Sequence, residues 1–259
     1  TQVRKANEYI YGLETKATFN EDTRKAYLGE AKFLRALLYF DMVKRYGGVP
    51  LIDKPQGLED NLFVPRATID ETFEFILKDL QTAITNLPRR NATEAGRATL
   101  GAAWALRSRV LLYWASPLFN SENKIQRWKD AADAAYEVIK LAKAGDYELS
   151  EDLNIWLTRD NRETIFEKQY LLGFKEHGWD GMHKPLSIAH NVGTKTNPTQ
   201  EMVDAFPMTN GLLPHQEGSG YDDQNPYAGR DKRFYADIVY HLRDYCGRLQ
   251  NCSVEAADL

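Results

Sequence analysis

The chain has 259 residues, of which 43% are hydrophobic and 27% charged, and its formal net charge is −4 at pH 7. This composition is that of a globular protein with a sizeable core, and the weakly acidic balance argues against a non-specific nucleic-acid surface. No apolar run is long enough to span a bilayer as a helix. Two cysteines, Cys246 and Cys252, are too few for a disulfide framework and do not indicate the compartment.

The first half of the chain predicts four helices, the first of them between Asp22 and Tyr46. That helix ends at Gly47, where glycine permits a left-handed backbone. Its main stripe of apolar residues recurs near the helical period: Tyr27, Ala31, Leu34, Leu38 and Met42. Phe33, Leu37 and Phe40 widen the stripe, so we expect this helix to be buried over much of its surface.

The next three predicted helices each have a start or stop signal. Thr68 and Glu71 form a T-x-x-E capping box at the start of the second, which Pro88 ends. The third begins near Thr99 and is closed by Pro117, with Arg107 as the single polar member of its apolar stripe. The fourth runs from about Ile125 to Ala144, with Trp128, Ala132, Ala135, Tyr136 and Ile139 on one side. We expect four tryptophans to lie in the core: Trp104, Trp114, Trp128 and Trp156.

Two successive antiparallel helix pairs are the unit of helical repeat proteins, although the strict repeat of about 34 residues is absent. We therefore predict a mainly α fold with tetratricopeptide-like helix pairs forming a scaffold over residues 1–150. A loop-rich, mixed α/β region is expected over residues 151–245, mounted on that scaffold within a single domain. A divergent tail would follow over residues 246–259.

After Gly145 the sequence becomes irregular. Thr164–Tyr170 and Phe234–Leu242 have the composition of strands, and Thr199–Phe206 that of a short helix. A long loop is expected over residues 173–198, and another over residues 210–230. Long structured loops on a rigid scaffold are where binding residues concentrate.

Trp179 is the leading candidate for a ligand contact, because it lies between two glycines in the polar segment HGWDG. An exposed indole can stack on the flat C–H face of a sugar ring, while His177, Asp180 and His183 could bond the sugar hydroxyls. The alternative is that Trp179 forms a local core beneath its own loop. Tyr221 and Tyr227, which flank the segment YDDQNPY, are further candidates for ligand contacts.

Signatures of catalysis and of metal binding are missing from the sequence. It contains no GxSxG, P-loop, HExxH or GxGxxG motif, and no acidic pair in a context typical of glycosidases. His177, His183 and His190 lack the close spacing typical of metal ligands. Asp222, Asp223 and Asn225 are interpreted as a turn rather than a cation site. We expect no enzyme activity, no metal and no cofactor.

Six segments, in order, resemble one family. EAKFLRALLYFDMVKRYGGVPLI, which begins at Glu30, resembles the signature helix and turn of the SusD/RagB family, the starch-utilisation-type lipoproteins of Bacteroidetes. The other five follow in the family's order: VPRATIDETFEFILKDLQTAITNLP, GRATLGAAWALRSRVLLYWASPLF, ETIFEKQY, NPTQEMVDAF and NPYAGRDKRFYADIVY. The resemblance covers nearly all of residues 19–240.

This resemblance implies a cell-surface protein held at the outer membrane by a lipid anchor. It implies capture of oligosaccharides, or in some members peptides, and their delivery to a SusC-like TonB-dependent transporter, without catalysis. Two other functions stay open from the residues alone: a helical-repeat scaffold that binds only proteins, and an enzyme such as a glycoside hydrolase.

The chain also departs from the family pattern. The resemblance implies that family members are longer, and from it we expect this chain, which begins at Thr1, to be without the lipobox cysteine, the first helices and the C-terminal part of the scaffold. After Tyr240 the segment HLRDYCGRLQNCSVEAADL is expected to have no likeness to the family, as a frameshift or truncation would produce. Sequencing the source locus tests that hypothesis. Helix pairs without their neighbours expose apolar faces, so we expect self-association or marginal stability.

Overall fold

The computed structural model describes residues 2–171, 173–185, 188 and 196–252, except for the side chains of Trp156, Trp179 and Asp180. The chain divides into two compact units, Thr1–Lys168 (unit 1) and Gln169–Leu259 (unit 2). Most of the regular structure is helical, so the predicted mainly α fold is confirmed.

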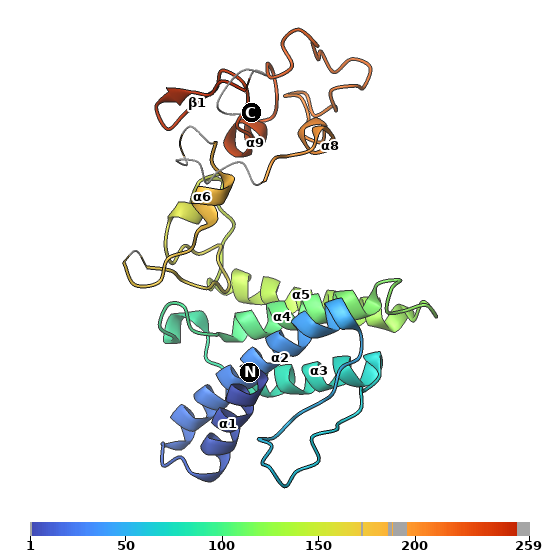
Figure 1. Ribbon diagram of the computed structural model, residues 1–259, viewed down its shortest axis with the longest axis vertical. Coiled ribbons are helices and arrows are strands. Elements are labelled where there is room, and N and C mark those ends of the chain that lie inside the picture. Colours follow the sequence, from blue (N-terminus) through green and yellow to red (C-terminus); the bar gives the residue numbers. More distant parts are fainter. Residues whose placement is uncertain (1, 172, 186–187, 189–195, 253–259) are drawn as a thin grey trace. The chain divides into compact units, whose positions relative to one another are not determined.

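Unit 1 is an array of five helices in which each packs against the next along the chain (Figure 1). The helices are α1 (Gln2–Thr15), α2 (Glu21–Tyr46), α3 (Ile69–Asn86), α4 (Leu100–Ala115) and α5 (Ile125–Lys143), with short 3₁₀ turns η1 (Arg90–Ala92) and η2 (Ile155–Leu157). The four predicted helices are confirmed as α2 to α5. The first helix, α1, was not predicted, because its buried side contains only Asn7, Ile10 and Leu13.

Local capping explains why the helices begin and end where they do. Asn20 caps α2 by accepting a bond from the Thr23 amide, and Gly47 ends it with a φ of +69°. Both bonds of the predicted Thr68–Glu71 capping box are present at α3. The Thr99 hydroxyl accepts the bond from the Ala102 amide that starts α4.

The buried face of α2 differs from the predicted stripe. Leu34 is 47% exposed, although the sequence placed it on the main apolar stripe. Of the predicted apolar residues the helix buries Ala31, Phe33 and Phe40, and it also buries Arg35, Ala36, Tyr39 and Val43, which were not predicted. Apolar residues lie on most sides of this helix, so periodicity alone does not identify the side that packs.

A buried ion pair joins α2 to α3. The Arg35 guanidinium donates to both oxygens of Asp79, from Nε at 2.6 Å and from Nη2 at 2.7 Å, and the two residues are 2% and 3% exposed. Nη1 of Arg35 donates to the Asn7 side chain of α1 and to the carbonyl of Asp53. Asn7 in turn donates to the Ile52 carbonyl. One network therefore fixes three helices and the segment that follows α2.

A second network joins α3, α4 and α5 at one end of the array. Asp70 accepts bonds from the Trp114 indole at 2.6 Å and from Nη2 of Arg127 at 2.9 and 3.0 Å. The Arg127 guanidinium lies 4.1 Å from the centre of the Trp114 ring. Burial acts to raise the pKa of Asp70, but the bonds from Trp114 and Arg127 outweigh it, so the pKa lies below its usual value.

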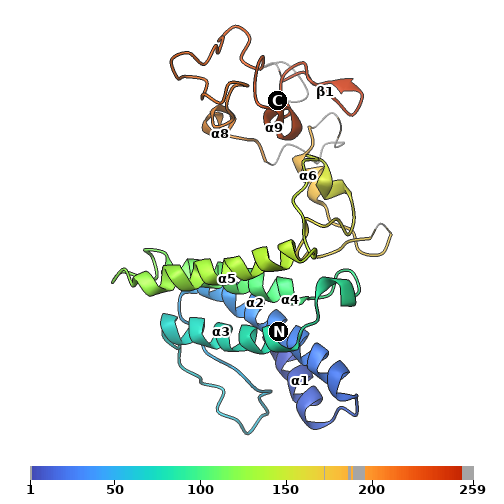
Figure 2. The same cartoon turned by 180° about the vertical axis from the view of Figure 1, so that it is seen from behind.

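The stripe predicted on α5 faces water rather than the core, which corrects the expectation for Trp128. Trp128, Tyr136 and Ile139 are 39%, 49% and 49% exposed, and α5 buries only Arg127, Ala131 and Ala134. Figure 2 shows α5, the last helix of unit 1 in chain order, lying alongside α4. Trp104 and Trp114 are partly buried against the core, as expected, and Trp156 lies outside the described side chains. Arg107 is half-buried, and burial lowers the pKa of its guanidinium.

Unit 2 has little regular structure. Its described elements are α6 (Trp179–His183), α8 (Gln200–Asp204), α9 (Lys232–Asp237) and a hairpin of β1 (Asp244–Tyr245) and β2 (Arg248–Leu249). Its core is organised by Arg230, which is 1% exposed and donates to the carbonyls of Val203, Phe206 and Pro226. The guanidinium also lies 4.8 Å from the Phe234 ring centre.

Both predicted strands are wrong. Thr164–Tyr170 is irregular rather than a strand, and its Thr164 carbonyl accepts a bond from Arg90. The first half of Phe234–Leu242 lies in α9, because Asp231 caps a helix there by accepting from the Arg233 amide. The predicted helix after Thr199 is confirmed as α8, with Thr199 as its cap.

We predict that Asp79→Ala lowers the free energy of unfolding by about 3–5 kcal/mol, because it leaves the Arg35 guanidinium buried without its carboxylate. Urea denaturation measures the loss. Glu74→Ala, an exposed position on the same helix, should change stability by no more than about 0.5 kcal/mol. The Arg35→Leu/Asp79→Leu double variant should be more stable than Asp79→Ala, since it removes the buried guanidinium together with its carboxylate and leaves only Lys32, whose side chain is 17% exposed, without its partner. An Asp79→Ala variant as stable as the parent would contradict this role for the pair.

We predict that Asp70→Asn costs about 0.5–1 kcal/mol at pH 7, a modest value because the Asp70 side chain is 49% exposed. The folded pKa of Asp70 lies below its ordinary value of 3.8, so this contribution is present above that value. It is lost as the pH falls through the lower folded pKa. Melting temperatures of the parent and the variant should therefore converge in acid. A difference that stays constant down to pH 2, or an equal loss in an Asp133→Asn control, would count against the mechanism.

Candidate ligand-binding pocket

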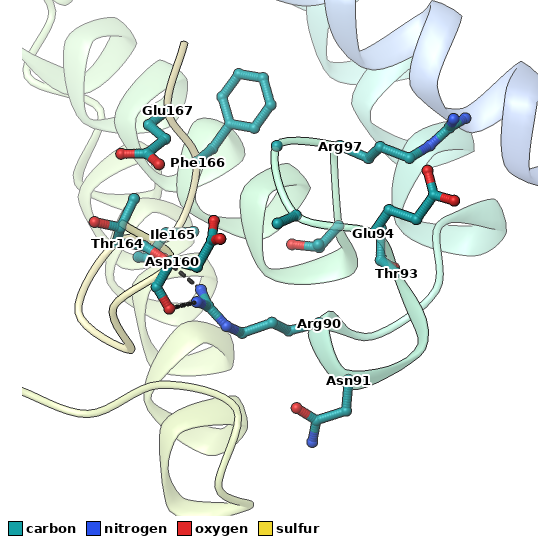
Figure 3. Close-up of a pocket in the computed structure, with 13 residues that line it drawn as sticks. Arg90, Asn91, Thr93, Glu94, Arg97, Asp160, Thr164, Ile165, Phe166 and Glu167 are labelled. Carbon is teal, nitrogen blue, oxygen red and sulfur yellow. Dashed lines mark hydrogen bonds between the residues drawn. The ribbon is translucent and has the colours of Figure 1, made fainter. Parts of the chain in front are cut away.

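A polar pocket of about 260 Å³ lies within unit 1, between the loop that follows α3 and the segment that leads out of the helix array (Figure 3). One wall is formed by residues 90–97 with Thr99, and the other by Asp160 and residues 164–167. The volume is just below the range of about 300–1,000 Å³ typical of small-molecule sites. It suits a short sugar segment rather than a whole polymer.

Arg90 holds the two walls together. Its guanidinium donates to the carbonyls of Thr164 and, at 3.1 Å, of Asp160 (Figure 3). It also donates to the Asn161 carbonyl at 2.9 Å. Beneath it lies the buried ring of Tyr147, 5.5 Å from the guanidinium carbon. The Tyr147 hydroxyl is 3.0 Å from that of Thr99, and burial raises the pKa of this phenol. Arg90 thus acts as a structural clamp that sets the width of the pocket.

The approach of Tyr147 also explains a glycine in α4. A Cβ atom built at Gly101 would lie 2.1 Å from the Tyr147 hydroxyl oxygen, which no side chain can tolerate. Gly101 therefore lets the ring reach the start of α4 and support Arg90 from below.

Arg97 anchors the other end of the loop to α2. It donates to both oxygens of Glu30, at 2.7 and 2.6 Å, and lies 5.2 Å from the Tyr27 ring centre. The bond to Glu30 is the largest of the effects that raise the pKa of Arg97. Both arginines of the pocket, Arg90 and Arg97, therefore donate hydrogen bonds to other groups of the protein.

Phe166 supplies the aromatic part of the wall. Its ring packs edge-on against the buried Phe33, with ring centres 5.0 Å apart, yet the residue remains 37% exposed. The remaining wall offers carboxylates from Glu94, Asp160 and Glu167, together with the Asn91 amide. An exposed ring beside several hydrogen-bond acceptors is the combination that recognises sugars, whose C–H faces stack and whose hydroxyls donate.

A second, larger hollow of about 440 Å³ lies between α1 and the segment after α2. Its walls are mostly apolar, with Val3, Met42 and Ile52 among them. Its two buried polar groups are bonded internally: Asn7 to Arg35 and Ile52, and the Tyr39 hydroxyl to the Ile52 amide. This hollow therefore presents few groups to a polar ligand.

The loop around Trp179 is only partly described. Trp179 and Asp180 begin the helix α6, so this segment is not the irregular loop that was expected, and their side chains lie outside the described part. His177 is exposed, with its ring edge-on to Tyr170 at 4.9 Å. His183 ends α6 and is half-buried, while His190 lies outside the described residues.

The two tyrosine candidates belong to different environments. Tyr227 packs in the aromatic core of unit 2, stacked on Tyr240 at 4.4 Å and on Phe234 at 6.2 Å. Tyr221 is half-buried beside His215, and burial raises the pKa of its phenol. Asp222 accepts bonds from the Gln224 amide and the Asn225 side chain, which is the geometry of the predicted turn.

Sequence reasoning missed the pocket in unit 1. Its walls are separated by about 70 residues in the chain, and the segments that form them carry no motif of their own for a ligand. Within the described residues, no three His, Cys, Asp or Glu side chains gather as a metal site would require. Cys246 and Cys252 are both exposed. None of the described helices has the length and apolar character of a membrane span.

Two family models match the chain. Residues 1–112 match a family described as "Starch-binding associating with outer membrane", and residues 125–254 match the SusD family. The second match extends beyond Tyr240, so the expectation that the likeness ends there is wrong. The first reaches back to residue 1, before the residues that carried the resemblance.

Solved structures and curated relatives agree with these matches. A SusD-like protein from Bacteroides fragilis is 36% identical, with a TM-score of 0.74 over 93% of this chain and 48% of that one. A SusD-like carbohydrate-binding protein from the same species is 22% identical and shares the fold, with a TM-score of 0.80 over 95% of this chain and 46% of that one. A SusD-like protein from Bacteroides ovatus is 29% identical over 65% of this chain and 31% of its own length.

The chain thus spans less than half the length of each of these relatives. Within that span, the two family models and the solved SusD-like structures match the same residues of units 1 and 2. The chain therefore belongs to the SusD family.

Proposed function

We propose that this chain is the part of an outer-membrane-associated protein that binds glycans at the cell surface. The observation that carries the proposal is the open polar pocket with Phe166 in its wall, in a chain of the SusD family. The family description names starch binding and the outer membrane, and one structural relative is named a carbohydrate-binding protein.

The chemistry of the pocket supports binding rather than turnover. Sugar hydroxyls would donate to the carboxylates of Glu94 and Glu167, while the exposed edge of Phe166 would contact a sugar ring. We propose that the bound glycan is passed unchanged to a SusC-like TonB-dependent transporter, and that a lipid anchor outside these residues attaches the protein to the surface.

We predict that Phe166→Ala weakens glycan binding by about tenfold, which corresponds to the 0.5–1.5 kcal/mol or so of an aromatic contact together with lost apolar area. Isothermal titration with malto-, cello-, xylo- and manno-oligosaccharides measures the change. Phe63→Ala serves as the matched control, because Phe63 is 92% exposed in the same unit and lies outside the pocket. Circular dichroism checks that both variants fold.

The same titration tests the loop around Trp179. If Trp179→Ala abolishes binding and its fluorescence change while Phe166→Ala does not, the ligand is bound by unit 2 and the pocket in unit 1 is not the site. No binding to any member of the panel would contradict the proposed function itself.

A second candidate function, protein binding along the helix array, is favoured by the exposed stripe of α5. Trp128, Tyr136 and Ile139 lie on one side of that helix at helical spacing and are 39–49% exposed. Clusters of exposed large apolar residues mark interaction surfaces. Such a surface does not compete with glycan binding, since it lies on another part of unit 1 from the pocket residues.

We predict that the chain self-associates through this stripe at micromolar concentration. The Trp128→Ser/Ile139→Ser variant should sediment as a monomer, because it removes two of the three exposed apolar side chains of the α5 stripe. Sedimentation velocity over a concentration series measures the effect, with Leu58→Ser, at a 95% exposed residue elsewhere in unit 1, as the control. A parent chain that is monomeric throughout the series would contradict the prediction.

A further inference from the structure

We propose that Phe19 is a second aromatic contact for the glycan, outside the pocket, and that the chain therefore prefers extended oligosaccharides over disaccharides. The proposal rests on the proposed function and adds the length of ligand that the site recognises.

Three positions of α2 lead away from the pocket. Tyr27, Glu30 and Phe33 follow one another at a spacing of three residues, which makes them neighbours on the helix surface. Phe33 packs against Phe166 of the pocket wall, with ring centres 5.0 Å apart. Glu30 accepts two bonds from Arg97, which lines the pocket and points toward α2 (Figure 3). One edge of the pocket therefore lies over this part of α2.

Beyond Arg97 the surface becomes aromatic. The Arg97 guanidinium lies 5.2 Å from the ring centre of Tyr27, which is half-buried. Phe19 packs edge-on against the same ring, with ring centres 5.4 Å apart and an interplanar angle of 84°. Phe19 itself is 52% exposed and directly precedes the Asn20 cap of α2. Tyr27 therefore supports the Phe19 ring in an exposed position.

Phe19 is not an isolated exposed ring. Tyr9 of α1 is 48% exposed. Partial burial raises the pKa of its phenol, and the nearby Glu30 carboxylate raises it further. Single exposed apolar residues are common on protein surfaces, whereas exposed rings that gather beside a pocket mark a binding surface.

The separation of the two aromatic contacts exceeds one sugar. Their supports on α2, Tyr27 and Phe33, are six residues apart, which is about 9 Å along the helix axis. A pyranose ring is similar in size to the phenyl ring on which it stacks, so one sugar cannot contact Phe19 and Phe166 together. An oligosaccharide that fills the pocket and extends past Arg97 can contact both. The second contact is then made by a ligand that is already bound, so it costs less in lost freedom than the first.

The test measures affinity against chain length. A series from the disaccharide to the heptasaccharide of the glycan that binds best in the panel is titrated against the parent chain and against Phe19→Ala. In the parent, affinity should rise by at least about tenfold along the series. Phe19→Ala should weaken binding of the longest member by about threefold to tenfold and leave binding of the disaccharide unchanged.

Three further variants assign the effect to the Phe19 ring. Tyr46→Ala, at a 66% exposed residue at the other end of α2, should bind every member like the parent. Phe19→Tyr keeps an aromatic ring and should keep the dependence on chain length, whereas Phe19→Leu should lose it. If circular dichroism shows that Phe19→Ala is misfolded, the comparison of Phe19→Tyr with Phe19→Leu decides in its place.

An affinity that does not rise with chain length in the parent overturns this inference and leaves the proposed function standing. So does a Phe19→Ala variant that loses affinity equally for every member, or for none. Binding of no member of the series would overturn both.

Discussion

The buried Arg35–Asp79 pair is the constraint on which unit 1 depends. Two charges that are only 2–3% exposed are costly to bury, and the cost is offset because every bond of the pair is short and shared with other groups. Arg35 also holds Asn7 of α1 and the Asp53 carbonyl, so α1, α2, α3 and the segment after α2 can pack in only one register. Well-packed hydrophobic replacements of buried ion pairs are often equally stable, but they lack the directional bonds that hold Asn7 and the Asp53 carbonyl in place.

The geometry of the pocket depends on how α2 and α3 are packed. The loop at residues 90–97 leaves the end of α3, whose position Asp79 fixes, and Arg97 ties the far end of that loop to Glu30 of α2. Arg90 then donates to carbonyls of the facing segment, which sets the distance between the two walls of the pocket. Arginine acts as the connector in each case, because its planar fork satisfies several acceptors at once. The ligand surface is therefore left to acidic, amide and aromatic side chains.

Helices α2 to α5 could be predicted from the sequence because their signals are local: Thr68 with Glu71, Thr99, Gly47 and the prolines that end them. The buried side of α2 and the exposed stripe of α5 could not, since both depend on which neighbours are present. The strand prediction for Thr164–Tyr170 was wrong for the same reason, because the Thr164 carbonyl accepts a hydrogen bond from Arg90. The pocket joins residues about 70 positions apart, a distance at which a single sequence gives no pairing signal.

The openness of the pocket bears on how such a protein would work. Under the proposed function, a hollow of about 260 Å³ with exposed Glu94, Asp160 and Phe166 would bury only part of a glycan, so each contact would contribute little and the complex would dissociate readily. A protein that releases its ligand to a transporter, as proposed, would gain nothing from very tight binding.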